Sequence, residues 1–119
     1  MARQRSIHPE IWTSDAVGRL PLPARLLWIG IFSTADDEGR LKGSPEHLRA
    51  TVFPHDRLSI PKIELWLALV EAEGMIRRYS VDGRQFIAVI NFRRYQRPKY
   101  PTPSKLPAPP SEGTSASSW

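Results

Sequence analysis

A helical segment that runs without a linker into a predicted β-hairpin sets the main limits on this fold. The helix is expected over residues 60–73, because Ser59 can cap its first turn and Gly74 can adopt the left-handed conformation that ends its last turn. Apolar side chains recur at helical spacing along one face, which is therefore expected to be buried. That face consists of Ile63, Trp66, Leu67 and Val70.

The hairpin that follows is defined by the dipeptide Asp82-Gly83, which separates the β-rich runs 75–81 and 84–92. Asp-Gly favours a type I′ turn, because both central residues of that turn need a positive φ. The turn fixes the register, and the predicted cross-strand pairs are Val81 with Arg84, Tyr79 with Phe86, Arg78 with Ile87, and Ile76 with Val89. A helix followed by a two-stranded ribbon is typical of the second half of a winged helix-turn-helix.

The N-terminal third of the chain predicts an arm and two helices. The arm, residues 1–12, is expected to pack through three apolar anchors, and a short helical turn follows at 15–19 with Thr13 or Ser14 as its cap. The anchors are Ile7, Ile11 and Trp12. The next helix, residues 23–34, is apolar nearly all round and is expected to be the central buried helix.

Glycine, serine and proline mark the remaining boundaries. Gly30, inside the central helix, indicates the close approach of another backbone, such as that of the arm. Residues 39–42 are expected to pair with the hairpin as a third strand. Ser44 and Pro45 begin a helix that runs to about Val52, and this helix and the next form a helix-turn-helix unit.

Together these elements predict an α+β fold, a winged helix-turn-helix with three to four helices and a two- to three-stranded wing. The domain boundaries follow: residues 1–19 are the arm and short helix, 20–92 the winged helix-turn-helix domain, and 93–119 a basic and then Pro- and Ser-rich tail. Residues 106–119 are expected to be disordered, and a connection to a further module stays open.

The positive charge of the chain is concentrated on the hairpin and the segment after it. The 119 residues carry a net charge of +5, yet residues 75–105 hold eight Lys and Arg against Asp82 alone. A positive field on one element attracts polyanions, so DNA, duplex or single-stranded, is the expected partner; a merely solvated surface is the plainer alternative. The residues predicted to contact phosphates are Arg77, Arg78, Arg84, Arg93, Arg94, Arg97 and Lys99, with Lys62, Arg3 and Arg5 as further candidates.

The segment after the hairpin has a pattern of its own, since basic residues interleave with Tyr95 and Tyr100 and prolines keep the chain extended. Such a segment suits backbone phosphates, and its tyrosines can stack on exposed bases. A linker made soluble by its charge is the alternative.

Metal, cofactor and catalysis are not expected. The adjacent carboxylates of Asp36, Asp37 and Glu38 raise the question of a metal site, but the run ends in glycine without a second ligand cluster, so these groups are expected to bond turn amides. The three histidines fall in different elements, and no catalytic set or phosphate loop stands out. The chain has no Cys, no signal-peptide-like run and no apolar stretch of membrane-spanning length, so a soluble intracellular protein is expected.

Several short motifs carry, by their order and spacing, a resemblance to a known family. They are Arg3-x-Arg5-Ser6-Ile7-x-Pro9-Glu10-x-Trp12, Ala35-Asp36-Asp37-Glu38-Gly39-Arg40-Leu41, Gly74-Met75-Ile76 with Tyr79 and Asp82-Gly83, Asn91-Phe92, and Gln96-x-Pro98 with Pro101-Thr102-Pro103-Ser104-Lys105. Over residues 3–105 the chain resembles the N-terminal winged-helix domain of phage replication proteins of the replisome-organiser or DnaD-like type. The resemblance implies a cytoplasmic protein of a bacterial host cell, of phage or prophage origin. It also implies DNA binding, oligomerisation and contacts with replication proteins during replication initiation.

The outer face of the helix at residues 60–73 is unusual for a helix that reads DNA. It offers Lys62 but also three glutamates and no Arg, whereas base reading normally uses Arg, Asn or Gln. Leu65 and Leu69 belong to a second apolar stripe there, which predicts burial by the first helices or a homo-oligomer contact. DNA affinity is therefore expected mainly from the wing and the basic segment, with the arm as a further candidate. A protein-interaction module or a phage transcriptional regulator is the alternative function.

Overall fold

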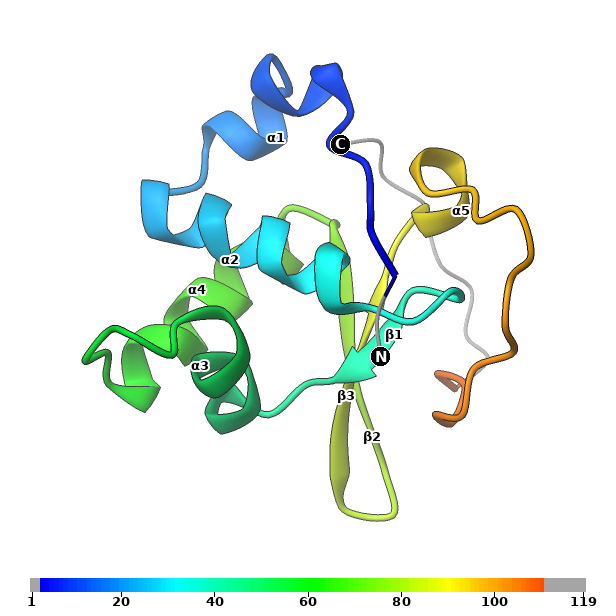
Figure 1. Ribbon diagram of the computed structural model, residues 1–119. Helices are drawn as coiled ribbons and strands as arrows, with labels where there is room; N and C mark the ends of the chain where they lie inside the picture. Colours follow the sequence, from blue (N-terminus) through cyan, green and yellow to red (C-terminus); the bar gives the residue numbers. More distant parts are fainter. Residues whose placement is uncertain (1–2, 111–119) are drawn as a thin grey trace.

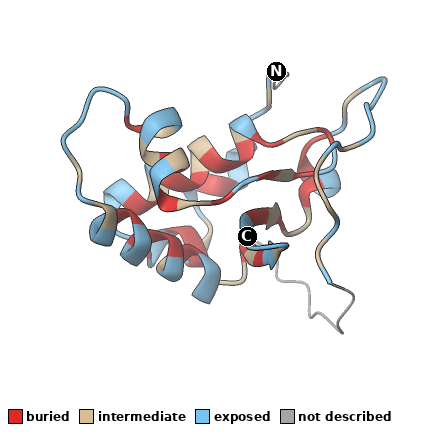
Figure 2. Ribbon diagram, turned by 90° about the horizontal axis from the view of Figure 1, so that it is seen from below, coloured by how far each residue is buried: buried red, intermediate tan, exposed pale blue. Residues whose placement is uncertain are grey.

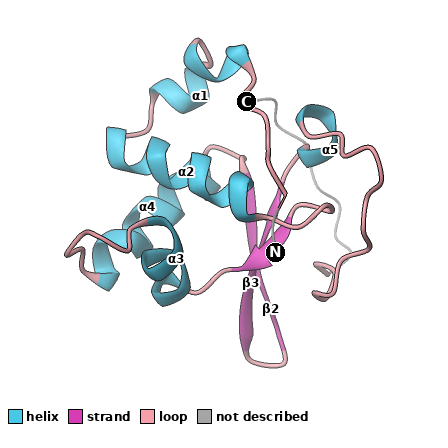
Figure 3. Ribbon diagram, viewed as in Figure 1, coloured by secondary structure: helices cyan, strands magenta, loops and turns pink. Residues whose placement is uncertain are grey.

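The chain folds with its main helices on one side of a small antiparallel sheet and its C-terminal segment on the other (Figure 1 and Figure 3). The computed structural model describes residues 3–110, which form an α+β fold with five α-helices and three strands. In chain order the elements are η1 (Pro9–Trp12), α1 (Asp15–Gly18), α2 (Leu22–Thr34), β1 (Arg40–Lys42), α3 (Pro45–Val52), α4 (Ile60–Ala72), β2 (Ile76–Val81), β3 (Arg84–Val89) and α5 (Phe92–Tyr95).

Serine hydroxyls fix the first turns of three helices, as the sequence predicts. Ser44 Oγ accepts a hydrogen bond from the amide of His47 at 3.1 Å, and Ser59 Oγ accepts one from the amide three residues on at 3.3 Å. Ser14, rather than Thr13, caps α1 in the same way. The predicted helices are confirmed to within one residue at either end, because their caps are local signals in the sequence.

The hairpin and the third strand are confirmed in the predicted register. Asp82 and Gly83 have φ values of 51° and 76°, the left-handed conformation that a type I′ turn requires. All four predicted cross-strand pairs occur between β2 and β3. β1 pairs with β3, so the strand order in the sheet is β1-β3-β2.

The second hairpin strand is shorter than predicted, because the chain turns away after Val89. Asn91 has a φ of 61°, and the residues that follow form α5 instead of continuing the strand to Phe92. This turn lets Phe92 pack onto Gly39, where an added Cβ would lie 2.7 Å from the Phe92 Cβ. Burial of an aromatic side chain thus decides the course of the backbone, and the predicted strand end is wrong.

α2 is the central helix, with Leu27 and Trp28 fully buried, but it is not enclosed on all sides (Figure 2). Leu22 and Leu26 are exposed on its outer side. Their exposure corrects the expectation of a helix buried nearly all round, since α3 and α4 pack only against its inner side.

Gly30 provides space for a side chain, not for a backbone. A Cβ at this position would lie 2.6 and 2.7 Å from the two γ-carbons of Val52 in α3. The close approach expected from the sequence is therefore present, but its partner is α3 and not the N-terminal arm.

The arm is held by one apolar anchor and by polar contacts. Of the three predicted anchors, Ile11 is buried, whereas Ile7 is exposed and Trp12 is 71% exposed, so the prediction holds for Ile11 alone. The backbone of Ser6 is instead bound by one amide side chain: Gln96 Nε2 donates to Ser6 O at 2.7 Å, and Gln96 Oε1 accepts from Ser6 N at 2.9 Å.

The segment after α5 runs back along the molecule instead of extending freely from it. The amide of Thr102 donates to Asp37 Oδ2 at 2.9 Å, and the hydroxyl of Tyr79 donates to Pro107 O at 2.7 Å. The expected tail is thus attached to the body through residue 107. Of the stretch expected to be disordered, residues 111–119 lie outside the described part. Among the helices of residues 3–110, none combines the length and apolar character of a membrane span.

Candidate nucleic-acid interface

The ten side chains predicted to contact phosphates occupy four separate places in the fold. Arg3 and Arg5 lie on the arm, Lys62 in the first turn of α4, Arg77, Arg78 and Arg84 on the hairpin, and Arg93, Arg94, Arg97 and Lys99 on α5 and just after it. They are not equally available, because the protein's own acids engage several of them.

Arg5 is a structural residue. Its side chain is 3% exposed, and its Nη2 donates to Asp37 Oδ1 and to Ala35 O, each at 2.9 Å. Its guanidinium also lies over the ring of Phe92, 5.1 Å from the ring centroid. Arg3, whose side chain is exposed at the surface, contacts the same carboxylate: its Nε lies 3.4 Å from Asp37 Oδ2. These contacts remove Arg5 from any phosphate-binding surface and tie Arg3 to the turn before β1.

Asp37 is a buried carboxylate at which both ends of the described chain meet. The amide of Thr102 and the side chains of Arg5 and Arg3 all contact it. The hydrogen bond from Thr102, followed by the two arginines, lowers the pKa of Asp37 below its ordinary value. The sequence predicts that these carboxylates bond turn amides, which Asp36 does twice at 3.0 Å. The link that Asp37 makes to the arm and to the C-terminal segment is not predictable from the turn itself.

Arg78 is engaged by acids of α4. Its guanidinium pairs with both carboxylate oxygens of Glu64, and its amide donates to Glu71 Oε2 at 2.7 Å. The hydrogen bond with Glu64 is the largest cause that raises the pKa of Arg78. Arg78 therefore fastens β2 to α4.

The remaining predicted cations do not form one continuous patch. Arg84 follows the hairpin turn, whereas Arg93, Arg97 and Lys99 lie in and after α5, beyond the other end of β3 (Figure 1). A strand of this length spans about 20 Å. The two groups therefore belong to different parts of the surface.

Of the two tyrosines expected to stack on bases, one is available. Tyr95 is buried, and the guanidinium of Arg94 lies 5.4 Å from its ring centroid. Tyr100 is exposed beneath Lys99, whose ammonium lies 5.6 Å from its ring centroid.

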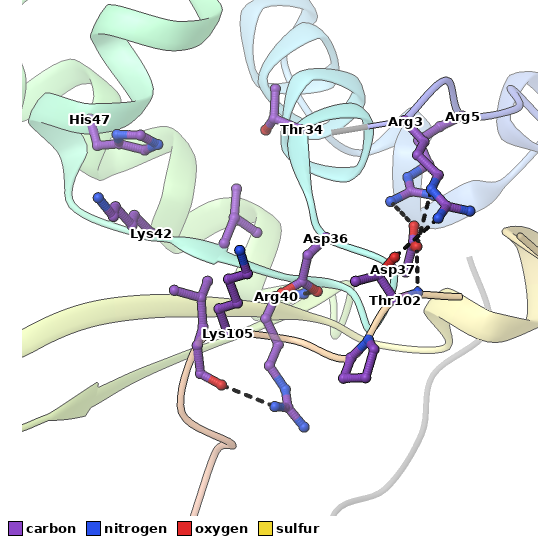
Figure 4. A pocket seen from close by; sticks show the side chains of 13 residues that line it. Arg3, Arg5, Thr34, Asp36, Asp37, Arg40, Lys42, His47, Thr102 and Lys105 are labelled. Atoms are coloured by element: carbon purple, nitrogen blue, oxygen red, sulfur yellow. Dashed lines mark hydrogen bonds and ion pairs between the residues drawn. The ribbon is translucent and has the colours of Figure 1, made fainter. Parts of the chain in front are cut away.

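A groove lined by basic side chains lies between the first turn of α3 and the hairpin turn. We define the cationic groove as Lys42, His47, Arg84 and Lys105. Lys42, His47 and Lys105 line two adjoining cavities of about 360 and 780 Å³, and Arg84 lines the larger one. Figure 4 shows Lys42, His47 and Lys105 at one end of the smaller cavity, and Arg3, Arg5 and Asp37 at the other.

Four different segments bring these basic side chains together. Lys42 ends β1, His47 lies in the first turn of α3, Arg84 begins β3, and Lys105 lies on the C-terminal segment. Within residues 3–110, Lys42, Arg84 and Lys105 make no ion pair. Among the described residues that line the larger cavity, Glu46 is the only acid. The groove therefore presents a surplus of positive charge to a ligand.

The surroundings of His47 disfavour the protonated imidazole in the free protein. Burial, and then the neighbouring charge of Lys42, lower the pKa of its imidazole below the ordinary value. The negative charge of a phosphate in the groove would favour the charged imidazole, because it would counter the positive charge of Lys42.

Lys42, His47 and Lys105 were missed by sequence reasoning, which followed the local excess of Arg after residue 75. One signal for Lys42 was present. The predicted third strand, in register with the hairpin, places Lys42 opposite Phe86, on the same side of the sheet as Arg84. Lys105 belongs to the basic run 75–105 but was not named as a phosphate contact, and His47 carries no signal in the sequence. Only the tertiary fold brings α3 and the C-terminal segment to this side.

The outer face of α4 offers little to DNA. Lys62 is exposed in its first turn, but Glu64 is paired with Arg78, and no Arg lies within the helix. Leu65 is 55% exposed, whereas Leu69 is half-buried and packs against the core. Of the predicted oligomer contact, Leu65 is thus the freely accessible side chain.

No group of acidic and histidine side chains within residues 3–110 is arranged to hold a metal ion. Comparison of the chain with protein-family models, with curated proteins and with solved structures gives no match. The arrangement of the site itself is therefore the basis for a functional proposal.

Proposed function

We propose that this chain is a DNA-binding protein of the winged-helix type that acts in phage replication initiation and holds DNA mainly through backbone phosphates. The cationic groove is the observation that carries the proposal. Lys42, Arg84 and Lys105 converge from three segments without ion-pair partners among the described residues, as a site for a polyanion requires.

The order of the elements supports the winged-helix part of the proposal. The helices α1 and α2 and the strand β1 precede the pair α3 and α4, and a two-stranded ribbon follows that pair. The first strand joins the ribbon at the edge of a three-stranded sheet. In such an arrangement α3 and α4 are the helix-turn-helix and the β2–β3 hairpin is the wing. The role in replication rests on the resemblance of residues 3–105 to phage replisome organisers.

The surface of α4 supports binding to phosphates over the reading of bases. Base-specific contacts need Arg, Asn or Gln in the groove of DNA, and the exposed face of α4 offers Lys62, glutamates and Leu65. We therefore assign modest sequence selectivity to this protein. We assign the exposed Leu65 to self-association, which light scattering tests.

The salt dependence of DNA affinity tests the proposal. Three phosphate contacts by Lys42, Arg84 and Lys105 predict a log–log slope of about −2 to −3 against salt concentration. Replacing all three by Gln is expected to bring the slope close to zero, measured by fluorescence anisotropy with a labelled oligonucleotide. Arg57→Gln is the matched control, because Arg57 is exposed in the turn between α3 and α4 and outside the groove. A slope that the triple variant leaves unchanged, or affinity that ignores salt, contradicts the proposal.

A further inference from the structure

The side of the sheet that faces away from α2, α3 and α4 has an unusual composition. Alternate residues of the three strands share this side, which we call the outer sheet face. Its cross-strand rows are Arg40 with Ala88 and Arg77, Lys42 with Phe86 and Tyr79, and Arg84 with Val81. Every charged residue in these rows is a cation, and the middle row holds two aromatic rings.

The two aromatic rings form a stacked pair. The ring centroids of Tyr79 and Phe86 lie 5.6 Å apart with an angle of 29° between the ring planes. They are only 8% and 5% exposed, although the helices cover the other side of the sheet. Their cover on the outer sheet face is the C-terminal segment: residues 104–107 line a cavity together with Phe86, and Pro107 O accepts from the Tyr79 hydroxyl at 2.7 Å.

Cations surround this pair closely enough to act on it. Burial is the largest cause acting on the pKa of Tyr79 and raises it; Arg40 lowers it, Asp36 raises it, and Arg77 lowers it. Lys42 and Arg84, at the same face, also line the cationic groove. Aromatic rings on a sheet, flanked by Lys and Arg, form the platform on which proteins stack unpaired bases while holding the backbone phosphates.

The cover is attached by side-chain contacts and not by a strand ladder. The hydroxyl of Ser104 donates to Asp36, its amide donates to Glu38, and Arg40 Nη1 donates to Leu106 O at 3.2 Å. No element of secondary structure is formed by residues 104–107. Such a segment can leave the sheet without breaking the sheet's own hydrogen bonds.

We propose that the outer sheet face is a binding platform for single-stranded nucleic acid, which residues 104–107 cover in the free protein and leave on binding. Tyr79 and Phe86 stack on bases, and Lys42 and Arg84, which stay in place when the cover carries Lys105 away, contact the backbone phosphates. This inference rests on the proposed function and adds a strand preference to it.

The test uses full-length variants that separate the cover from the rings. Tyr79→Phe keeps the ring but removes the hydrogen bond to Pro107, so single-strand affinity is expected to rise about two- to tenfold. Leu106→Ser loosens the cover and is expected to act in the same direction. Phe86→Leu removes one stacking surface and is expected to weaken single-strand binding about fivefold or more, with duplex binding changed less than about twofold.

The probes are oligo-dT and oligo-U of about 12 nucleotides and a duplex of the same length, followed by anisotropy. If Tyr79→Phe binds oligo-dT more tightly, the ligand is single-stranded DNA; if it binds oligo-U more tightly, the ligand is RNA. Unchanged single-strand affinity in both Tyr79→Phe and Leu106→Ser overturns the platform proposal, and this outcome does not depend on whether Phe86→Leu folds. In that case salt-dependent duplex binding by the same proteins leaves the proposed function standing, whereas failure to bind any of the probes removes both.

Discussion

Gly30 in α2 leaves room for Val52 of α3, and this contact can be tested at the level of one methyl group. Gly30→Ala would place a Cβ 2.6 Å from a γ-carbon of Val52. Overpacking costs about 1–3 kcal/mol and exceeds the gain of about 1 kcal/mol in helix propensity. We therefore expect a net loss of about 1 kcal/mol in the free energy of unfolding, measured by urea denaturation.

Gly18 supplies the matched control, because an added Cβ there meets nothing within 4 Å. Gly18→Ala is expected to gain about 0.4–1 kcal/mol by restricting the unfolded chain. Equal stability of the two variants would contradict the packing argument.

Single residues also show where sequence reasoning stops. A glycine inside an apolar helix indicates that something approaches closely, but it carries no information on what approaches, and the arm was the wrong partner for Gly30. Arg5 is a similar case. Its burial depends on Asp37 and Phe92, which lie far along the chain, so its charge alone predicted a surface contact that the fold does not provide.

At the level of elements, Arg78 and Glu64 join the hairpin to α4 across the edge of the sheet. Because the Glu64 carboxylate is about half exposed, solvent screening limits the pair, and a double-mutant cycle with Arg78→Gln and Glu64→Gln is expected to give a coupling of about 0.5–1 kcal/mol. The coupling should shrink as salt is raised. A coupling indistinguishable from zero at low salt would show that this ion pair does not hold β2 to α4, and would leave that role to the apolar contacts and to the hydrogen bond from the Arg78 amide to Glu71.

The elements themselves were predictable wherever the deciding signal is local. Ser44 and Ser59 cap their helices, and Asp82-Gly83 fixes the hairpin register, because each acts on residues within one turn. The end of β3 was not predictable, since Phe92 leaves the strand to pack on Gly39. The path of residues 96–107 was not predictable either, because its partners are side chains of the arm and of the turn before β1.

For the molecule as a whole, the turn before β1, which holds Asp36 and Asp37, is where the two ends of the described chain are attached to the body. Arg3 and Arg5 from the arm and Thr102 from the C-terminal segment all contact Asp37, and Ser104 contacts its neighbour Asp36. A change at this single carboxylate therefore reaches both the arm and the segment that walls the cationic groove. The basic run after residue 75, which first indicated DNA, is thus only one part of the site. The cationic groove also needs Lys105 in place, and the contacts of Asp36 and Asp37 with the C-terminal segment hold it there.

Acid should release that attachment through Asp37. Because its pKa is lowered in the folded protein, its stabilising contribution is present above the ordinary carboxyl pKa of about 4 and is lost as pH falls through the lower folded value. Asp37→Asn is expected to lower the melting temperature at pH 7 and to differ less from the wild type as pH approaches 3. Hydrogen exchange of the Thr102 amide should quicken about tenfold in this variant at neutral pH.

Asp56→Asn is the control for this experiment, because Asp56 is exposed in the turn between α3 and α4. Its melting temperature should follow that of the wild type at every pH. If Asp37→Asn instead lowers the melting temperature by the same amount at pH 3 as at pH 7, the loss arises from packing and not from the carboxylate charge. Quickened exchange at Thr102 together with a pH-dependent loss would show that one buried charge holds the C-terminal segment in place.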